Sequence, residues 1–278
     1  MKTLDLEEIR LHWKDWAEKY GKELRATTKT STVKTIEVDA LVRAIRLIEL
    51  ERGSKLNIME MGCGNGHNCL SLSRFFPAAS FTGVDFIREM VDAANSLKEG
   101  NGVSDENLVF KEGNVLDLDF PESSFDIVFT DRCLINLNTD SLQQKAVRSL
   151  SNSLKAGGYL LMIENSQQTY DNQNKARELV GLASRNPAEF NHFFNENTLL
   201  PYLATIGLEL FDVEDFISFH DLVLYVLVPM LNGGVVDYEH PIVEAATKLN
   251  MALSSIRPDG LGTFGQNRLF KCRKTIAS

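Results

Sequence analysis

A short glycine-rich segment contains the residues whose types and spacing point most directly to chemistry. Glu60-Met61-Gly62-Cys63-Gly64-Asn65-Gly66 follows an apolar run that predicts a strand and precedes a segment that predicts a helix. Glycines in such a turn let the backbone approach a ligand closely and adopt positive φ angles. A helix that begins there adds amide donors and the positive end of its dipole. We therefore expect a ligand to bind at this turn.

An acidic residue at the end of the next predicted strand narrows the class of ligand. Asp85 lies 19 residues after Gly66, at a place where a carboxylate can accept both hydroxyls of a ribose. The succession of strand, loop, helix, strand and acid predicts a ligand that contains a nucleoside. The dinucleotide fingerprint G-x-G-x-x-G needs a third glycine where this chain has His67, which disfavours a nicotinamide dinucleotide.

The glycine-rich segment resembles motif I of the class I S-adenosylmethionine-dependent methyltransferases, E/D-x-G-x-G-x-G. Three later segments resemble further motifs of that family in the same order. GVDF at residues 83–86 is similar to the ribose-binding acidic motif, and EGNVLDLDFPESSFDIVF at residues 112–129 to the adenine-binding segment with the fourth strand. LKAGGYLLMIE at residues 154–164 is similar to the fifth strand. The four matches span about 110 residues.

This resemblance implies S-adenosylmethionine as the cofactor and S-adenosylhomocysteine as its product, and it implies binding roles residue by residue. Gly62 and Gly64 would pass beneath the methionine and ribose portions. Asp85 would hold the ribose hydroxyls. Phe86 would pack against adenine, with an ordinary core position as the alternative for this side chain.

Three later positions complete the implied cofactor contacts in the sheet. Asn114 stands where the family often has Asp and would meet the adenine amino edge, while Val115 would supply its backbone amide. Asp131, at the end of the fourth predicted strand, lies where the backbone of the family often meets the methionine amino group. Asn114 and Asp131 are also ordinary turn formers, so a purely structural role stays open for both.

The N-terminal aromatic residues resemble a lid. HWKDWAEKYG at residues 12–21 is similar to the leading helix that folds over the cofactor in many such enzymes. Tyr20 would cover the methionine end, and Arg25 would pair with its carboxylate. Simple packing of an aromatic helix on the sheet is the alternative.

The choice of catalytic residues depends on the acceptor. A hydroxyl acceptor benefits from a general base, whereas an amine needs only to be neutral. Doubly wound sheets bind ligands beyond the carboxyl ends of their strands, which selects His192 and Glu164 as candidates. The unperturbed pKa of histidine lies near neutral pH, and packing of His192 within its loop is equally open. No metal cluster is recognised, although a Mg²⁺ between Asp131 and Glu164 stays open.

The segment after the fifth predicted strand predicts a polar acceptor. ENSQQTYDNQNKARELVGL at residues 164–182 is rich in amides and hydroxyls, unless it is simply a solvated helix. LRATTKTSTVKTIEVDAL at residues 24–41 and FGQNRLFKCRK at residues 264–274 resemble bacterial methyltransferases of sugar and surface-glycan biosynthesis. We expect O-methylation of a small or glycan-linked acceptor, with N-methylation of an amino sugar or small amine as the alternative. A nicotinamide-dependent oxidoreductase and a non-catalytic S-adenosylmethionine-binding regulator are the competing classes.

Alternating strands and helices must position these residues. Strands are predicted at residues 55–61, 80–85, 108–114, 125–131 and 159–165, with two more near 208–218 and 264–274. Helices between them imply right-handed crossovers. We expect a Rossmann-like, doubly wound α/β sheet of seven strands, mostly parallel with a reversed edge strand. It would form a single domain, 1–278, with a lid (1–50), a cofactor core (51–165) and an acceptor side (166–278).

Composition excludes several other classes. The 278 residues carry a net charge of −9 and are 44% hydrophobic, which excludes disordered and collagenous chains. No basic run suggests binding to nucleic acid. The apolar run at residues 222–231 is half of what a bilayer needs, so it predicts a buried helix, or else a contact for a homodimer or a lipid-linked substrate. An N-terminus without an apolar core and four cysteines without CxxC spacing predict reduced thiols in the cytoplasm.

Overall fold

A seven-stranded sheet organises the protein. The computed structural model describes residues 4–28, 30–104, 106–256 and 262–276. The strands are β1 (Asn57–Met61), β2 (Ser80–Asp85), β3 (Leu108–Glu112), β4 (Phe125–Asp131), β5 (Leu154–Asn165), β6 (Leu208–Glu214) and β7 (Asn267–Lys274). Their order across the sheet is β3-β2-β1-β4-β5-β7-β6, and β1 to β5 pair in parallel. The direction of winding reverses between β1 and β4, which is where such sheets bind ligands.

One strand runs against the others, and its position corrects the sequence prediction. The predicted seven-stranded, mostly parallel α/β sheet is confirmed. The reversed strand, however, is β7, and it lies between β5 and β6 rather than at the edge. β7 is therefore hydrogen-bonded on both sides, which buries Lys271. Its ammonium group is paired with Asp212 and Glu214 of β6 at 2.9 and 2.7 Å. Because these carboxylates neutralise the charge, Lys271 does not need the contact with water that an edge strand would give.

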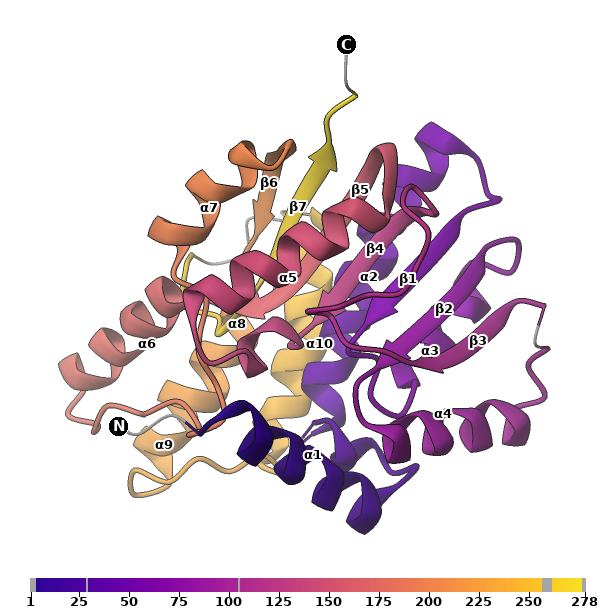
Figure 1. Ribbon diagram of the computed structural model, residues 1–278. Helices are drawn as coiled ribbons and strands as arrows, with labels where there is room; N and C mark the ends of the chain where they lie inside the picture. The colour runs from indigo at the N-terminus through magenta and orange to yellow at the C-terminus, as the bar shows by residue number, and fades with distance from the viewer. Residues whose placement is uncertain (1–3, 29, 105, 257–261, 277–278) are drawn as a thin grey trace.

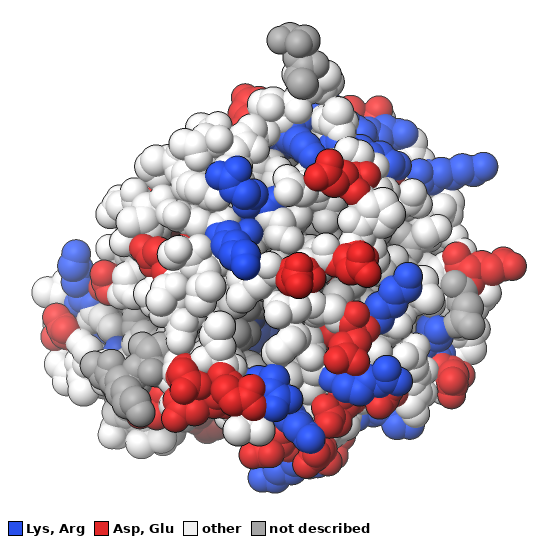
Figure 2. Space-filling view, in the orientation of Figure 1, with Lys and Arg blue, Asp and Glu red and all other residues white. Residues whose placement is uncertain are grey.

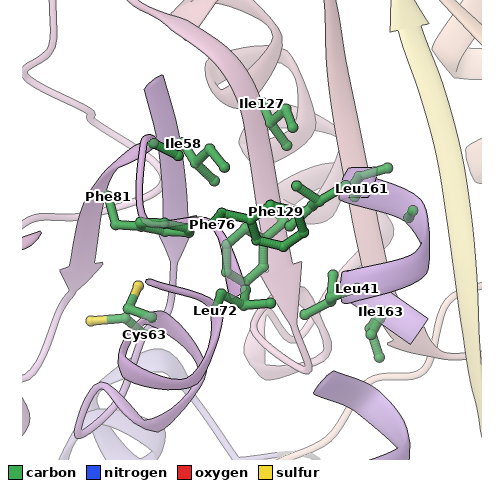
Figure 3. Packing of buried hydrophobic residues seen from close by; sticks show 14 of the residues in the cluster. Leu41, Ile58, Cys63, Leu72, Phe76, Phe81, Ile127, Phe129, Leu161 and Ile163 are labelled. Atoms are coloured by element: carbon green, nitrogen blue, oxygen red, sulfur yellow. The ribbon is translucent and has the colours of Figure 1, made fainter. Parts of the chain in front are cut away.

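Helices cover both faces of the sheet because successive strand residues point to opposite sides. Ile127 and Phe129 pack on one side, while Val128 packs on the other. The first side is covered by α2 (Ser31–Arg52), α3 (His67–Phe75), α4 (Arg88–Gly100) and α10 (Pro241–Ile256), the second by α5 (Asp140–Ser153) and α7 (Glu196–Thr205). Figure 3 shows the first of these cores, where Leu41 of α2 faces Phe129 and Leu161. Burial of each such side chain contributes about 1.5–3 kcal/mol.

The first helix, α1 (Leu6–Tyr20), lies across the carboxyl ends of the parallel strands (Figure 1, indigo). Asp5 and Glu8 form a reciprocal capping box at its start, which satisfies backbone amides that the helix leaves free. Ala17 packs against Met90 of α4, and Lys14 pairs with Glu89 at 3.3 Å. The predicted leading helix therefore exists and contacts the cofactor half of the sheet.

The apolar run near residue 225 forms a helix with an irregular middle. α8 (Ser218–Leu222) continues into a π-helical turn, η3 (Val223–Leu227), and then into α9 (Val228–Leu231). Val223, Leu224 and Val228 pack against α10, so the buried helix predicted from the sequence is confirmed. Within the described part of the chain, no helix has the length and apolarity needed to cross a membrane.

Capping residues set where helices start. α5 begins after Thr139, whose side chain accepts a hydrogen bond from the amide of Leu142. Asn138 donates to the carbonyl of Leu4 at 3.0 Å. Its amide ties the N-terminal segment to the body of the protein.

Candidate active site

A cavity of about 890 Å³ lies at the carboxyl ends of β1, β2, β4 and β5, beneath α1. This volume falls within the usual range for sites that enclose small molecules. Figure 2 shows acidic and basic side chains intermixed on the viewed face of the molecule. The cavity divides into a part beside the glycine-rich turn, called here the cofactor half, and a part beside β5, β7 and η3, called the acceptor half.

The glycine-rich turn forms the floor of the cofactor half, as predicted. Gly62 and Gly64 line the cavity with φ angles of 75° and 52°. A Cβ on Gly64 would lie 2.4 Å from the Cγ2 of Thr27, so both backbone conformation and space require glycine. Asn65 is fully buried and donates to the carbonyls of Gly21 and Glu23, both at 2.9 Å, which fastens the turn to the N-terminal segment.

The predicted ribose and adenine positions lie together along the same wall. The two oxygens of Asp85 accept from the amides of Gly64 at 2.7 Å and Ile87 at 2.9 Å. Burial raises the pKa of Asp85, and these amides partly offset that effect. Each carboxylate oxygen keeps a further lone pair for a hydroxyl donor. Phe86 lines the cavity although 45% of its surface is exposed, an arrangement that leaves the ring open to a flat partner.

Asn114 and Val115 continue this wall, and both line the cavity. Asn114 accepts from the amide of Leu116 at 2.9 Å through its side-chain oxygen, which fixes the amide plane and leaves its NH₂ group to donate. Together these groups fit an adenosine-containing cofactor. They are the glycine-rich turn, the carboxylate of Asp85 with its free lone pairs, the exposed ring of Phe86 and the amide of Asn114.

A buried ionic cluster lies where the methionine end was predicted. Asp131 lines the cavity and accepts from Lys34 of α2 and from Asn68 of α3. Burial would raise the pKa of Asp131, but Lys34 and Arg132 outweigh it and lower the pKa to about 2. Lys34 also pairs with Glu37 at 2.9 Å. A carboxylate held ionised in this way offers an anionic partner for an amino group.

Sequence reasoning missed Lys34 and Asn68, although one signal was present. Lys34 stands on the face of α2 that carries Val38, Leu41 and Ile45, at intervals typical of a buried helical stripe. A lysine on such a stripe needs a buried acidic partner. Arg132, the residue after Asp131, has a φ angle of 56°, which is unusual for a residue other than glycine.

The predicted lid residues occupy different positions. Arg25 lines the cavity and pairs with Glu23 at 2.6 Å. Tyr20, a described residue, does not line the cavity; it packs against Trp16 with ring centroids 4.8 Å apart. Trp13 and Trp16 line the cavity in its place. Tyr20 lies on the same face of α1 as Trp13 and Trp16, but at the C-terminal end of the helix and outside the set of residues that line the cavity. Its predicted role as a cover for the methionine end therefore has no support from the cavity lining.

Neither predicted catalytic residue lies at the described cavity wall. His192 contacts Asp140 through Nε2 at 2.6 Å, and its amide donates to the carbonyl of Ile135 at 2.7 Å. Glu164 is fully buried and accepts from Thr130 at 2.7 Å and from the amides of Leu134 and Ile135 at 3.1 and 3.3 Å. His192 therefore packs in its loop, and Glu164 holds the turn that follows β4. Their catalytic roles therefore stay predictions, without a contact to the cavity in this structure.

The acceptor half has a polar wall that sequence reasoning left unassigned. Asp221 lines it and accepts from the amide of Gln266 at 2.7 Å, while its other oxygen lies 3.0 Å from Nδ1 of His220. Asn165 and Asn267 pair across β5 and β7. In the part of the chain that the structure describes, no group of three or more His, Cys, Asp or Glu side chains is placed to hold a metal ion.

Comparisons with known proteins agree with this geometry. Residues 52–204 match the family model described as a methyltransferase domain. The chain is 29% identical over 149 residues to an uncharacterized methyltransferase, YcgJ, of Bacillus subtilis, covering 51% of this chain and 56% of that protein. It is 24% identical over 141 residues to a phosphoethanolamine N-methyltransferase of Plasmodium falciparum, covering half of each. The chain thus spans about half the length of these relatives.

A solved structure extends the likeness to the whole fold. Magnesium protoporphyrin IX methyltransferase of Synechocystis PCC 6803, with bound S-adenosylhomocysteine, superposes with a TM-score of 0.59 at 14% identity, covering 98% of this chain and all of that one. The family model covers more than half of the chain. The chain therefore belongs to the methyltransferase domain family, with the Rossmann-like fold and the methyl donor S-adenosylmethionine of that family.

Proposed function

We propose that the protein transfers a methyl group from S-adenosylmethionine to a hydroxyl of a small polar acceptor, with a sugar or glycan-linked molecule as the first candidate. The observation that carries this proposal is the polar wall of the acceptor half, which directly adjoins the cofactor half. Its amide and hydroxyl side chains are Asn165, Asn191, Tyr225, Tyr238, Gln266 and Asn267. Such groups suit a hydroxylated acceptor better than a lipid.

The chain divides by role. Within the predicted lid (1–50), α1 covers the cavity, whereas α2 packs on the sheet as a core helix. Residues 51–165 bind the cofactor, and 166–278 shape the acceptor half. His12 of α1 stacks on Phe190 at 4.3 Å, and the amide of Leu4 donates to the carbonyl of Glu189 at 3.1 Å. These contacts join the lid to the acceptor side. In the proposal, the closed lid excludes water from the space where methyl transfer takes place, and it holds the two reactants in line.

Asp221 is the proton acceptor in this proposal. Asp221 is chosen by its place in the acceptor half, where it also accepts from the amide of Gln266. The other described carboxylates of the cavity serve elsewhere: Glu7 pairs with Arg10 of α1, Asp131 pairs with Lys34, and Asp85 lies at the ribose position. The pKa of Glu60 is raised to about 8 by burial, so it holds its proton at neutral pH. When bound, the donor would supply an electrophilic methyl group on a sulfonium, whose S–C bond breaks as the C–O bond forms and which leaves as S-adenosylhomocysteine. Asp221 takes the proton of the acceptor hydroxyl.

N-methylation of an amino sugar or another small amine is the second candidate. It is favoured by the relative that is a phosphoethanolamine N-methyltransferase. An amine that reaches the site in its neutral form needs no carboxylate base. A regulator that binds the cofactor without turnover would bind S-adenosylhomocysteine but methylate no acceptor.

Calorimetric titration with S-adenosylhomocysteine tests the proposal first. We expect micromolar binding to the wild type and at least tenfold weaker binding to Asp85→Ala, because the ribose loses a charge-assisted hydrogen bond of about 1.5–3 kcal/mol. Asp92→Ala on the exposed side of α4 removes the same charge outside the cavity and should bind like the wild type. Screening of sugars, amino sugars and small amines with labelled donor then identifies the acceptor. A folded wild type that does not bind the ligand contradicts the proposal.

Two further proposals concern the setting of the protein. In the first, the exposed side chains Leu227, Met230 and Leu231 on the otherwise buried apolar helix form the contact of a homodimer. Light scattering of the purified protein would detect this dimer. A cytoplasmic location stays a prediction from the unpaired cysteines.

A further inference from the structure

Two arginines beside the acceptor half lack an acidic partner among the described residues. Arg132 and Arg268, also largely buried, are each paired with carboxylates. The described contacts of Arg177 and Arg185, by contrast, are with carbonyl, amide and aromatic groups. Arg177 is 4% exposed, and its pKa is lowered by burial and by Arg185. The described contacts thus leave both guanidinium groups without a directly paired carboxylate.

Arg185 lines the cavity and is held in place by α6 (Gln167–Leu179) and by the π-helical turn. Its amide donates to the Oδ1 of Asn174 at 2.9 Å, and its carbonyl accepts from the Nδ2 of Asn174 at 3.0 Å. Its Nη1 donates to the Oε1 of Gln173 at 2.8 Å, and its guanidinium lies 3.6 Å from the centre of the Tyr225 ring. A side chain fixed in advance loses little entropy when a ligand binds.

Arg177 supports this arrangement from behind. Its Nε donates to the carbonyl of Ala183 at 2.8 Å, and its Nη1 donates to the carbonyl of Tyr225. It thereby joins the loop that carries Arg185 to the π-helical turn that carries Tyr225. π-Helical turns inside helices frequently occur at functional sites.

The polar groups that remain free are those that an anion needs. Among the described residues, Nε and Nη2 of Arg185 have no hydrogen-bond partner, and together they form the edge of the guanidinium that matches a carboxylate or phosphate. Tyr170 is 2% exposed and is not among the residues that line the cavity. The guanidinium of Arg185 lies 5.6 Å from its ring centre, so this ring adds to the support of Arg185 and is not itself part of the anion site.

We propose that Arg185, supported by Arg177, binds an anionic oxygen group of the acceptor, a carboxylate or a phosphate. Anchoring the acceptor at Arg185 leaves Asp221 to the reacting hydroxyl. The proposal rests on the proposed function in one respect, because it assigns the anion to the methyl acceptor. The anion-binding site itself can be tested by binding measurements that need no methyl transfer.

The test measures the binding of small anions to protein saturated with S-adenosylhomocysteine, so that the cofactor half is filled. Inorganic phosphate is titrated by ³¹P NMR and acetate by saturation-transfer NMR, at constant ionic strength. We expect saturable binding of at least one anion to the wild type, and at least tenfold weaker binding to Arg185→Gln. Lys175→Gln removes a positive charge from the exposed side of α6, the helix that precedes the loop of Arg185, and should leave the affinity unchanged. The better-bound anion identifies the acceptor group.

Two outcomes overturn the proposal: no saturable binding of either anion to the wild type, or equal affinity of the wild type and Arg185→Gln. Titration with S-adenosylhomocysteine checks that each variant is folded. Should Arg185→Gln not fold, Arg185→Lys serves instead; it keeps the charge but loses the paired donors, so its affinity should still fall by several fold. A wild type that fails to bind S-adenosylhomocysteine overturns the proposed function. In that case the anions are titrated into the protein without S-adenosylhomocysteine, and the same comparison of the wild type with Arg185→Gln tests the anion site.

Discussion

At the scale of single residues, the carboxylates of the cavity differ in what already binds their oxygens. Asp131 accepts from Lys34 and stays ionised. Glu60 accepts from Asn68 at 2.7 Å and from the thiol of Cys69 at 3.0 Å, and burial raises its pKa to about 8. Chemically similar side chains thus become a charged anchor and a neutral polar group because their surroundings differ.

Replacement of Asp221 by Asn should separate hydroxyl from amine acceptors. With a hydroxyl acceptor, kcat should fall by about 10²–10⁴-fold, while the affinity for S-adenosylhomocysteine stays unchanged. Asp171→Asn, the same change on the exposed side of α6, should keep full activity. An undiminished kcat at neutral pH in Asp221→Asn would instead favour the amine.

Glu60 should make the stability of the protein depend on pH. Between the ordinary carboxyl pKa of about 4.3 and the folded value, the folded protein holds a proton that the unfolded chain has released. The free energy of unfolding therefore falls as pH rises from about 5 to 8, by at most about 1.4 kcal/mol per pH unit from this group. Urea unfolding across this range should show a smaller slope in Glu60→Gln. Identical slopes would mean that Glu60 is ionised in the folded protein.

At the scale of elements, each functional helix is fixed by polar contacts at its ends as well as by its apolar face. The turn after β4 is held by Glu164, α5 begins at Thr139, and α1 begins at the capping box of Asp5 and Glu8. Such caps supply hydrogen bonds for amides that have no partner inside the helix. Glu164, near the end of β5, does the same for the turn after β4, because it accepts from the amides of Leu134 and Ile135.

Removal of the α5 cap should cost a measurable amount of stability. Thr139→Ala should lower the free energy of unfolding by about 1 kcal/mol, within the usual range of about 0.5–2 kcal/mol for cap residues. Ser141→Ala, two residues further along the same helix, removes a hydroxyl that is not the cap and should change stability by less than about 0.5 kcal/mol. Equal effects of the two variants in urea unfolding would contradict the assigned cap.

At the scale of the whole molecule, α1 connects the two halves of the cavity. It packs on α4 of the cofactor half through Ala17 and Met90, and it stacks on the acceptor loop through His12 and Phe190. Trp13 reaches the turn after β4, where its indole donates to Asn136 at 3.1 Å. A ligand in the cavity adds apolar contacts beneath this helix, because Trp13 and Trp16 face the enclosed space.

Ligand binding should therefore protect the backbone of α1 from hydrogen exchange. With saturating S-adenosylhomocysteine, we expect at least tenfold slower exchange in residues 6–20, since opening of the lid then requires loss of ligand contacts. Exchange in α5, which lies outside the roof of the cavity, serves as the internal reference and should change little. Equal slowing in both helices would indicate global stabilisation without closure of a lid.

The sequence by itself determined the cofactor half. Gly62, Gly64 and Asp85 lie within one strand, turn, helix and strand, so their relative positions follow from local backbone geometry and the parallel pairing of β1 with β2. The alternation of elements likewise predicted seven strands and their helices. Short separation along the chain leaves few ways to arrange such residues.

Only the tertiary structure decided which distant side chains meet. Lys34 and Asp131 are 97 residues apart, and Trp13 and Asn136 are 123 apart; spacing in the sequence carries no information about such pairs. The same holds for β7, whose place between β5 and β6 depends on long-range pairing, and for the removal of His192 and Glu164 from the cavity wall. Residue types predicted what these groups can do, and packing decided which of them face the ligand, because a side chain acts only where the fold leaves it uncovered.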